Sequence, residues 1–218
     1  MVDLKLLQHL ESFLTEKRKQ RFEEVLSHRT KHFTVATEDV YHLHNTSAVM
    51  RNCEVFGIQE INVVEETNTK KIDREIALGA QKWVDVLRFT TVTDCIGSLR
   101  KRGYQIVATT PHFKELKLKD FDIIPKSCIF FGRETEGLSE EVLDQADTLI
   151  NIPMVGFTES LNVSVSAAIV LQDITSRLRQ TDLNWQLSDE EKNYKKMEWI
   201  KKTIHSYDEI VDRFYSPK

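Results

Sequence analysis

The sequence predicts an α/β fold, a mostly parallel sheet with helices on both faces. Short apolar runs typical of buried strands alternate with helical stretches along the middle of the chain. The 218 residues are 40% hydrophobic and 29% charged with four prolines, which fits one compact domain with helical additions. Ligands of open parallel sheets bind at the carboxyl ends of the strands, so the functional site is expected at that edge.

Six apolar segments are predicted as short buried strands, with helices between most of them. The strands are FTVAT (33–37), INVV (61–64), WVDVL (83–87), YQIVAT (104–109), CIFF (128–131) and TLINI (148–152). The helical stretches are 47–56, 76–80, 93–102 and 139–146. Gly57 and Gly103 stand where a glycine commonly ends a helix, which supports two of these assignments.

Further helices are predicted toward both ends of the chain. Residues 3–29 carry apolar side chains at helical spacing. The stretch 160–178 is a predicted helix rich in small residues, which would let its backbone approach a neighbour closely. After the polar segment 181–191, apolar residues recur at steps of three and four and predict one amphipathic helix. Its seam comprises Met197, Ile200, Ile204, Tyr207, Val211 and Phe214.

This seam needs a partner surface, either the protein's own core or another subunit. From it we predict a homodimer. The chain is accordingly divided into an N-terminal helical arm (1–30), an α/β core (31–180) and a C-terminal helical extension (181–218).

Two short basic runs lie in and just after the N-terminal arm, although the net charge of the chain is −4. Net charge is a poor guide when charge is segregated. KRKQR (17–21) and RTK (29–31) make this arm locally basic, so it is a candidate RNA-binding surface, with a merely solvated face as the alternative. The candidate RNA contacts are Lys17, Arg18, Lys19, Arg21 and Arg29.

Cysteine usage and hydropathy indicate a soluble, cytoplasmic protein. The three cysteines form no C-x-x-C pair and lie in apolar segments, which predicts buried, reduced thiols. The N-terminus is broken by charges and is not a signal peptide, and the longest apolar run (167–171) is far too short to span a membrane. No metal site is expected, because the histidines of YHLH (41–44) do not form a ligand set.

The stretch FGRETEGLS (131–139) joins a predicted strand to a predicted helix, a junction where many proteins bind phosphate. A P-loop needs a lysine after its second glycine, whereas Gly137 is followed by Leu138. A dinucleotide fingerprint needs three glycines at the first strand–helix turn, and acidic Glu134 and Glu136 would repel phosphate. A capped turn remains, with Ser139 as the predicted N-cap of the following helix.

Three segments taken together resemble a known family. HNTSAVMRNCEVFG (44–57), FGRETEGLSEEVLDQAD (131–147) and INIPMVGFTESLNVSVSAAIVL (150–171) are similar, in order and spacing, to the three motifs of the SPOUT-class RNA ribose 2′-O-methyltransferases. The upstream run 21–45 resembles the TrmH branch, which methylates guanosine 18 of tRNA. The resemblance covers most of residues 16–180. It implies a deep C-terminal trefoil knot, S-adenosylmethionine as cofactor and tRNA as partner.

The resemblance also implies four catalytic residues. Arg51 matches an arginine that acts on the ribose 2′-hydroxyl, and because arginine keeps its proton we expect it to stabilise the emerging oxyanion. Asn45 is expected either to cap the helix that carries Arg51 or to orient Arg51. Glu134 is expected to position the arginine or the RNA, and Asn162 to belong to the site at the head of its helix.

By the same resemblance, the cofactor is held mainly by backbone groups of three loops. Pro153 has a fixed φ and no N–H, which makes it the expected rigid wall of the cofactor pocket. The cofactor-binding residues implied are Thr109, Gly132, Ile152, Pro153, Met154, Ser160 and Leu161.

The leading hypothesis is methyl transfer from S-adenosylmethionine to tRNA, at the D-loop guanosine 18. A ribosomal RNA 2′-O-methyltransferase shares all three motifs, but such enzymes often carry a separate N-terminal domain, which is not expected here. A non-catalytic RNA-binding protein of the same fold is a third possibility, disfavoured because the four catalytic residue types are all present. A nucleotide-cofactor oxidoreductase is disfavoured by the missing glycine fingerprint.

Overall fold

The computed structural model describes residues 2–40, 43–65, 79–111, 116–133 and 136–216. The chain divides into two units, which are described separately. A helical unit contains both ends of the chain, Met1–Arg29 and Gln186–Lys218, and an α/β unit contains Thr30–Trp185. The expected division into an arm, a core and an extension stays a prediction.

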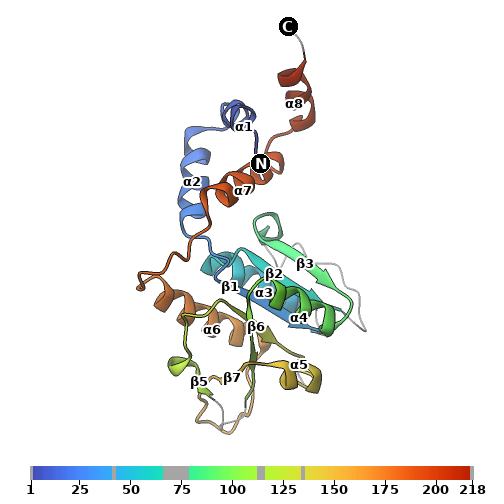
Figure 1. Cartoon of the computed structure of the whole chain (residues 1–218), viewed down its shortest axis with the longest axis vertical. Helices are drawn as coiled ribbons and strands as arrows, with labels where there is room; N and C mark the ends of the chain where they lie inside the picture. The colour runs from blue at the N-terminus through green and yellow to red at the C-terminus, as the bar shows by residue number, and fades with distance from the viewer. Residues whose placement is uncertain (1, 41–42, 66–78, 112–115, 134–135, 217–218) are drawn as a thin grey trace. The chain divides into compact units, whose positions relative to one another are not determined.

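Within its described residues, the α/β unit contains a seven-stranded sheet in the order β3-β2-β1-β6-β4-β7-β5, and every strand pair in it is parallel. Figure 1 labels β1, β2 and β3 beside one another in this sheet. The strands are β1 (Phe33–Glu38), β2 (Glu60–Val64), β3 (Asp85–Phe89), β4 (Gln105–Thr109), β5 (Leu116–Lys117), β6 (Ser127–Phe131) and β7 (Thr148–Asn151). The predicted fold class is confirmed, as are the six predicted strands. The two-residue β5 was missed because so short a strand leaves no pattern in the sequence.

Helices cover both faces of the sheet and enclose two cores. On one face lie α3 (Leu43–Phe56) and α6 (Val163–Leu178), and on the other lie α4 (Val92–Lys101) and α5 (Glu140–Gln145). Successive strand residues point to opposite faces, so Val35 packs in the first core and Ala36 in the second. Two 3₁₀ helices, η1 (Ala80–Lys82) and η2 (Leu118–Asp120), pack with the first core.

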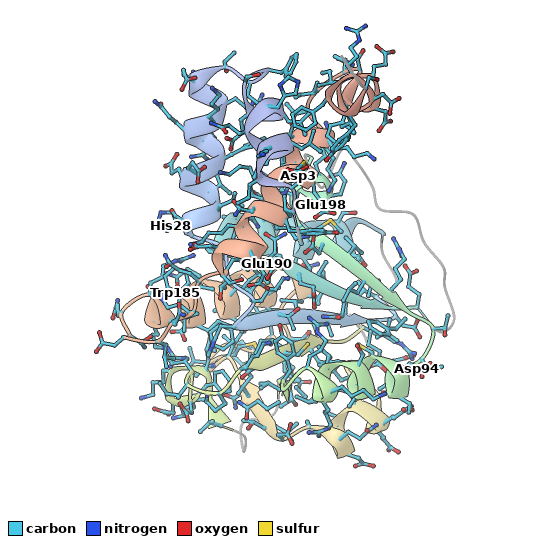
Figure 2. The ribbon with its side chains drawn as sticks, turned by 45° about the horizontal axis from the view of Figure 1, so that its top comes forward. Asp3, His28, Asp94, Trp185, Glu190 and Glu198 are labelled. Atoms are coloured by element: carbon cyan, nitrogen blue, oxygen red, sulfur yellow. The ribbon has the colours of Figure 1, made fainter. Side chains whose placement is uncertain are left out.

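Glycines and short polar side chains set the ends of these helices. Gly57 and Gly103 follow α3 and α4 with φ of 83° and 79°, the left-handed conformation predicted for helix-ending glycines. Thr91 caps α4, since its hydroxyl accepts a hydrogen bond from the Asp94 N–H (3.1 Å) and donates one to the Asp94 carboxylate (2.8 Å; Asp94 is labelled in Figure 2). Of the predicted helix 76–80, residues 76–78 lie outside the described residues.

The helical unit brings the two ends of the chain together. It contains α1 (Leu4–Glu11), α2 (Glu16–Ser27), α7 (Asp189–Lys201) and α8 (Tyr207–Tyr215). Helix α7 contacts both α1 and α2, where the Phe22 and Trp199 rings meet edge to face at 5.5 Å. Lys196 forms ion pairs with Glu11 (3.1 Å) and Glu23. Of the C-terminal seam, Ile200 is fully buried and the Phe214 ring lies 5.0 Å from that of His9, so the seam has a partner within its own chain.

The prediction of one long C-terminal helix is wrong. Helix α7 ends at Lys201, and Ser206 has a φ of 47°, a left-handed conformation that an α-helix does not contain, before α8 begins. Helix α8 then contacts α1: the Tyr215 hydroxyl donates a hydrogen bond to the Asp3 carboxylate (2.7 Å; Asp3 is labelled in Figure 2). The helical pattern over residues 3–29 is likewise divided into two helices, with Thr15 as the cap of α2.

Candidate active site

A cavity of about 400 Å³ lies at the carboxyl ends of β4, β6 and β7. Its walls come from the end of β4, the loop after β6, the segment after β7 and one side of α6. The volume falls in the range of small-molecule pockets. The position is the one that the parallel sheet predicts.

Six of the seven residues proposed to bind a cofactor line this cavity. They are Thr109, Gly132, Ile152, Met154, Ser160 and Leu161. Pro153 is exposed and is not part of the lining, so the expected rigid proline wall is absent from the cavity. Contact with a cofactor stays a prediction for all seven.

Helix α6 supplies a wall that sequence reasoning missed. Val163, Ser166 and Val170 line the cavity, at steps of three and four residues along the helix. This spacing places them on one side of α6. This spacing is visible in the sequence, but it looks the same as that of an ordinary helix face that packs in the core.

The glycines of the loop after β6 serve a tight turn. A Cβ atom on Gly132 would lie 2.2 Å from the carbonyl carbon of Gly137 and 2.3 Å from the nitrogen of Leu138. The backbones of Arg133 and Gly137 are joined by two hydrogen bonds of 2.9 and 3.1 Å, and Gly137 has a φ of 73°. Only glycine allows this approach and this conformation, which explains both residues without a phosphate.

The head of α6 is joined to α3 by polar side chains. Asn162 is the N-cap of α6, with its Oδ1 accepting hydrogen bonds from the Ser164 N–H (2.8 Å) and hydroxyl (2.6 Å). Its Nδ2 donates to Oδ1 of Asn45 (3.3 Å), and Nδ2 of Asn52 donates to the Ser164 carbonyl (2.7 Å). Asn45 and Asn162, predicted from separate motifs, are thus in contact beside the cavity.

Asn45 is not the N-cap of its helix. Helix α3 begins at Leu43, so Asn45 lies within the first helical turn. The sequence offers three favourable N-cap residues in succession, which are Asn45, Thr46 and Ser47. It therefore does not reveal that the helix begins before all three of them. The side chain of Asn45 instead meets Asn162.

Arg51 lies on the same helix, roughly 9 Å further along its axis than Asn45. Its side chain is exposed and does not line the cavity. Within the described part of the chain, no hydrogen bond or ion pair engages it. Glu134 lies outside the described residues, and the catalytic roles of all four residues stay predictions.

Most of the residues proposed to contact RNA lie on α2. Lys17, Arg18 and Arg21 are exposed, Lys19 pairs with Glu16 (2.6 Å), and Arg21 pairs with Glu24 (2.8 Å). Arg29 is different, because it is fully buried with its guanidinium 5.7 Å from the centre of the Trp199 ring. The prediction that Arg29 contacts RNA is wrong, since a buried guanidinium cannot reach a phosphate.

The residues that the structure describes contain neither a metal centre nor a membrane-spanning helix. No group of three or more His, Cys, Asp or Glu residues there is arranged to hold a metal ion. No helix among them combines the length and the hydropathy needed to cross a membrane.

Comparison with known proteins yields consistent matches. The model of the SpoU rRNA methylase family matches residues 32–172. A tRNA (guanosine(18)-2′-O)-methyltransferase of Borreliella burgdorferi is 35% identical over 204 residues, which cover 94% of each chain. The crystal structure of the Aquifex aeolicus TrmH/SpoU tRNA modifying enzyme superposes with a TM-score of 0.79 at 30% identity, over 87% of this chain and 98% of that one.

A third similar protein carries a cofactor. The AdoMet-bound rRNA methyltransferase of Sinorhizobium meliloti has a TM-score of 0.62 and 26% identity, over 69% of this chain and 58% of that one. Together these matches confirm the resemblance identified from the three sequence motifs.

Proposed function

Because the chain belongs to the SpoU rRNA methylase family, we propose that it transfers a methyl group from S-adenosylmethionine to a ribose 2′-hydroxyl of tRNA, at guanosine 18. The observation that carries this proposal is the contact between Asn45 and Asn162 beside the cavity. It joins the first and third family motifs at the edge of the sheet where a ligand is expected. The relative matched over nearly the whole chain bears this activity in its name.

The cavity fits S-adenosylmethionine in size and chemistry. Apolar side chains of Ile152, Met154 and Leu161 offer a surface for flat or aliphatic groups, and hydroxyl and main-chain groups near Thr109 and Ser160 offer polar contacts. The Thr109 hydroxyl already donates to the Phe130 carbonyl (2.8 Å), so we expect its contribution to come through its main chain. The bound cofactor would supply an electrophilic methyl group.

The protein's own residues would align the nucleophile and stabilise its developing charge. An alcohol is a poor nucleophile at neutral pH, and the permanent positive charge of Arg51 would stabilise the emerging 2′-oxyanion. The proton then leaves through phosphate or water. Asn45 and Asn162 hold the first turn of α3 against the head of α6, which fixes the helix that carries Arg51 relative to the cavity.

We propose tRNA, bound with the help of exposed Lys17, Arg18 and Arg21, over ribosomal RNA. The relative that matches 94% of this chain is named for tRNA, and a match of that length extends into the helical unit. A tRNA-modifying role implies a cytoplasmic location. The family resemblance further implies a trefoil knot in the C-terminal part of the α/β unit.

The function is tested with purified protein, labelled S-adenosylmethionine and unmodified RNA transcripts. Label is expected in a tRNA transcript and is expected to disappear when guanosine 18 is replaced. Label confined to a ribosomal RNA fragment would support the alternative substrate. RNA binding with no label in either RNA would indicate a non-catalytic protein.

Asn162 offers a test of the contact between α3 and α6. Asn162→Ala removes the N-cap of α6 and is expected to cost about 1 kcal/mol of unfolding free energy. Asn162→Asp keeps the capping oxygen, which the helix dipole favours, but removes the amide that donates to Asn45. We expect the Asp variant to unfold as the wild type does in urea, yet to transfer methyl groups roughly 3- to 10-fold more slowly. Wild-type activity in the Asp variant would contradict a role for this contact.

We also propose a homodimer, on different grounds from the C-terminal seam. Leu161, Val165 and Ile169 form an exposed apolar strip at steps of four residues, from the residue before the α6 N-cap onward. Phe157 and Val155, in the preceding segment, are fully exposed as well. An apolar surface of this extent commonly marks an interface, and a second copy of the chain related by a two-fold axis would cover it.

Ile169→Lys is expected to convert the dimer into a monomer, because the charge would be buried at the interface without a partner. Light scattering should give twice the chain mass for the wild type and the single chain mass for the variant. Leu4→Lys, an equally drastic change at an exposed leucine of the helical unit, should leave the dimer intact. A monomeric wild type would refute the proposed homodimer.

A further inference from the structure

Two consecutive acidic residues at the carboxyl end of β1 contact the loop that walls the cavity. Glu38 ends β1 and Asp39 follows it, and they are only 2% and 3% exposed. An Oε2 atom of Glu38 accepts a hydrogen bond from the Ser139 N–H (2.9 Å). An Oδ2 atom of Asp39 accepts one from the Arg133 guanidinium (2.9 Å). Arg133 and Ser139 lie at the two ends of the loop, so β1 holds it at both.

Arg133 connects this anchor to the cavity. Its guanidinium also pairs with Glu136 (2.6 Å), and its backbone closes the turn through the two hydrogen bonds with Gly137. These three residues, with Gly132 and Leu138, line the cavity. The hydrogen bonds to Glu136 and to Asp39 raise the pKa of Arg133 above its usual value, so the guanidinium stays charged between the two carboxylates.

Burying the carboxylates of Glu38 and Asp39 costs free energy of folding. Burying a carboxylate removes its hydration, which a charged hydrogen bond only partly offsets. Asp39 also has a φ of 42°, a strained left-handed conformation for a residue other than glycine. Buried charge and backbone strain commonly concentrate at functional sites. Here both occur in the residues that hold the cavity wall.

We propose that Glu38 and Asp39 are positioning residues for the methyl-transfer site, which fix Gly132, Arg133 and residues 136–139 in the pose that binds S-adenosylmethionine. They act through Ser139 and Arg133 and touch neither the cofactor nor the RNA. This inference rests on the proposed function, because it takes the cavity as the cofactor site. Because the wall is already ordered, the cofactor binds without losing free energy to the ordering of the loop.

Asp39→Asn tests the anchor with little disturbance of the backbone. Asparagine has the same size and tolerates the left-handed conformation, so the substitution removes the negative charge that faces Arg133 and keeps the shape of the side chain. We expect the KM for S-adenosylmethionine to rise about tenfold, with kcat at saturating cofactor within about threefold of the wild type. Calorimetry should show the same weakening in the Kd of the cofactor.

Glu60→Gln is the matched control. Glu60 is 5% exposed and pairs with Arg102 (2.5 Å), but it begins β2, at the opposite end of the parallel sheet from the cavity. We expect Glu60→Gln to lose about as much unfolding free energy as Asp39→Asn does, but to leave the KM for S-adenosylmethionine unchanged. Equal KM effects in the Glu60 and Asp39 variants would overturn the proposal, since a merely structural role would explain both.

Arg133→Gln and the double variant with Asp39→Asn complete the experiment, and Arg133→Gln alone tests the anchor if Asp39→Asn does not fold. If Asp39 acts through Arg133, the double variant should weaken cofactor binding no more than the Arg133 variant does. Additive losses, or single variants that bind as the wild type does, would overturn the proposal. A wild type that binds no S-adenosylmethionine would instead refute the proposed function itself.

Discussion

Arg51→Ala is expected to lower the rate of methyl transfer about 10²- to 10³-fold while leaving the affinity for S-adenosylmethionine unchanged. Removing a group that stabilises a developing oxyanion costs roughly this factor in other enzymes. Arg51 is exposed, does not line the cavity and forms no hydrogen bond or ion pair with a described residue, so its loss should not disturb the fold or the cofactor site. Radiolabel transfer to tRNA measures the rate, and calorimetry measures the cofactor affinity.

Two further variants make this test specific. Arg51→Lys keeps the charge without the guanidinium geometry and should recover part of the rate. Arg88→Ala removes another exposed arginine, from the edge strand β3, and should leave the rate unchanged. Wild-type turnover in Arg51→Ala would show that Arg51 takes no part in methyl transfer.

Gly132→Ala is expected to weaken S-adenosylmethionine binding by about tenfold or more. The added methyl group would lie 2.2 Å from the backbone of Gly137, so the loop must shift. The part of the cavity wall that this loop forms would shift with it. Forcing an extra carbon into a packed site typically costs about 1–3 kcal/mol. Calorimetric titration measures the loss of affinity, and urea unfolding measures the accompanying loss of stability.

Gly97→Ala is the control for this substitution. Gly97 lies inside α4, and a Cβ atom added there would meet no neighbouring atom within 4 Å. Alanine should therefore raise stability by about 0.5–1 kcal/mol and leave binding unaltered. If Gly132→Ala bound the cofactor with wild-type affinity, the loop after β6 would not be the wall of its site.

The strands of this protein could be predicted because buried parallel strands are continuous apolar runs with short-range signals. Features that depend on distant contacts could not. Helix α7 packs on helices from the other end of the chain, and the burial of Arg29 depends on Trp199. The sequence shows Arg29 only as a member of a basic run, and basic runs are usually exposed.

The candidate site was predicted in outline, through the resemblance rather than through local pattern. The motifs identified Asn45 and Asn162, but their contact spans 117 residues and only the structure reveals it. The roles of Glu38 and Asp39 went unrecognised for the same reason. Acidic residues at the end of a strand are ordinarily solvated, and their partners lie 101 and 94 residues further along the chain.

Mass-spectrometric mapping of ribose methylation tests the central claim most directly. Unmodified tRNA and ribosomal RNA are incubated with the protein, with and without S-adenosylmethionine, and digested for sequencing by mass. The account predicts 2′-O-methylguanosine at position 18 of tRNA, present only when the cofactor is added. The absence of any new ribose methylation in both RNAs would contradict it.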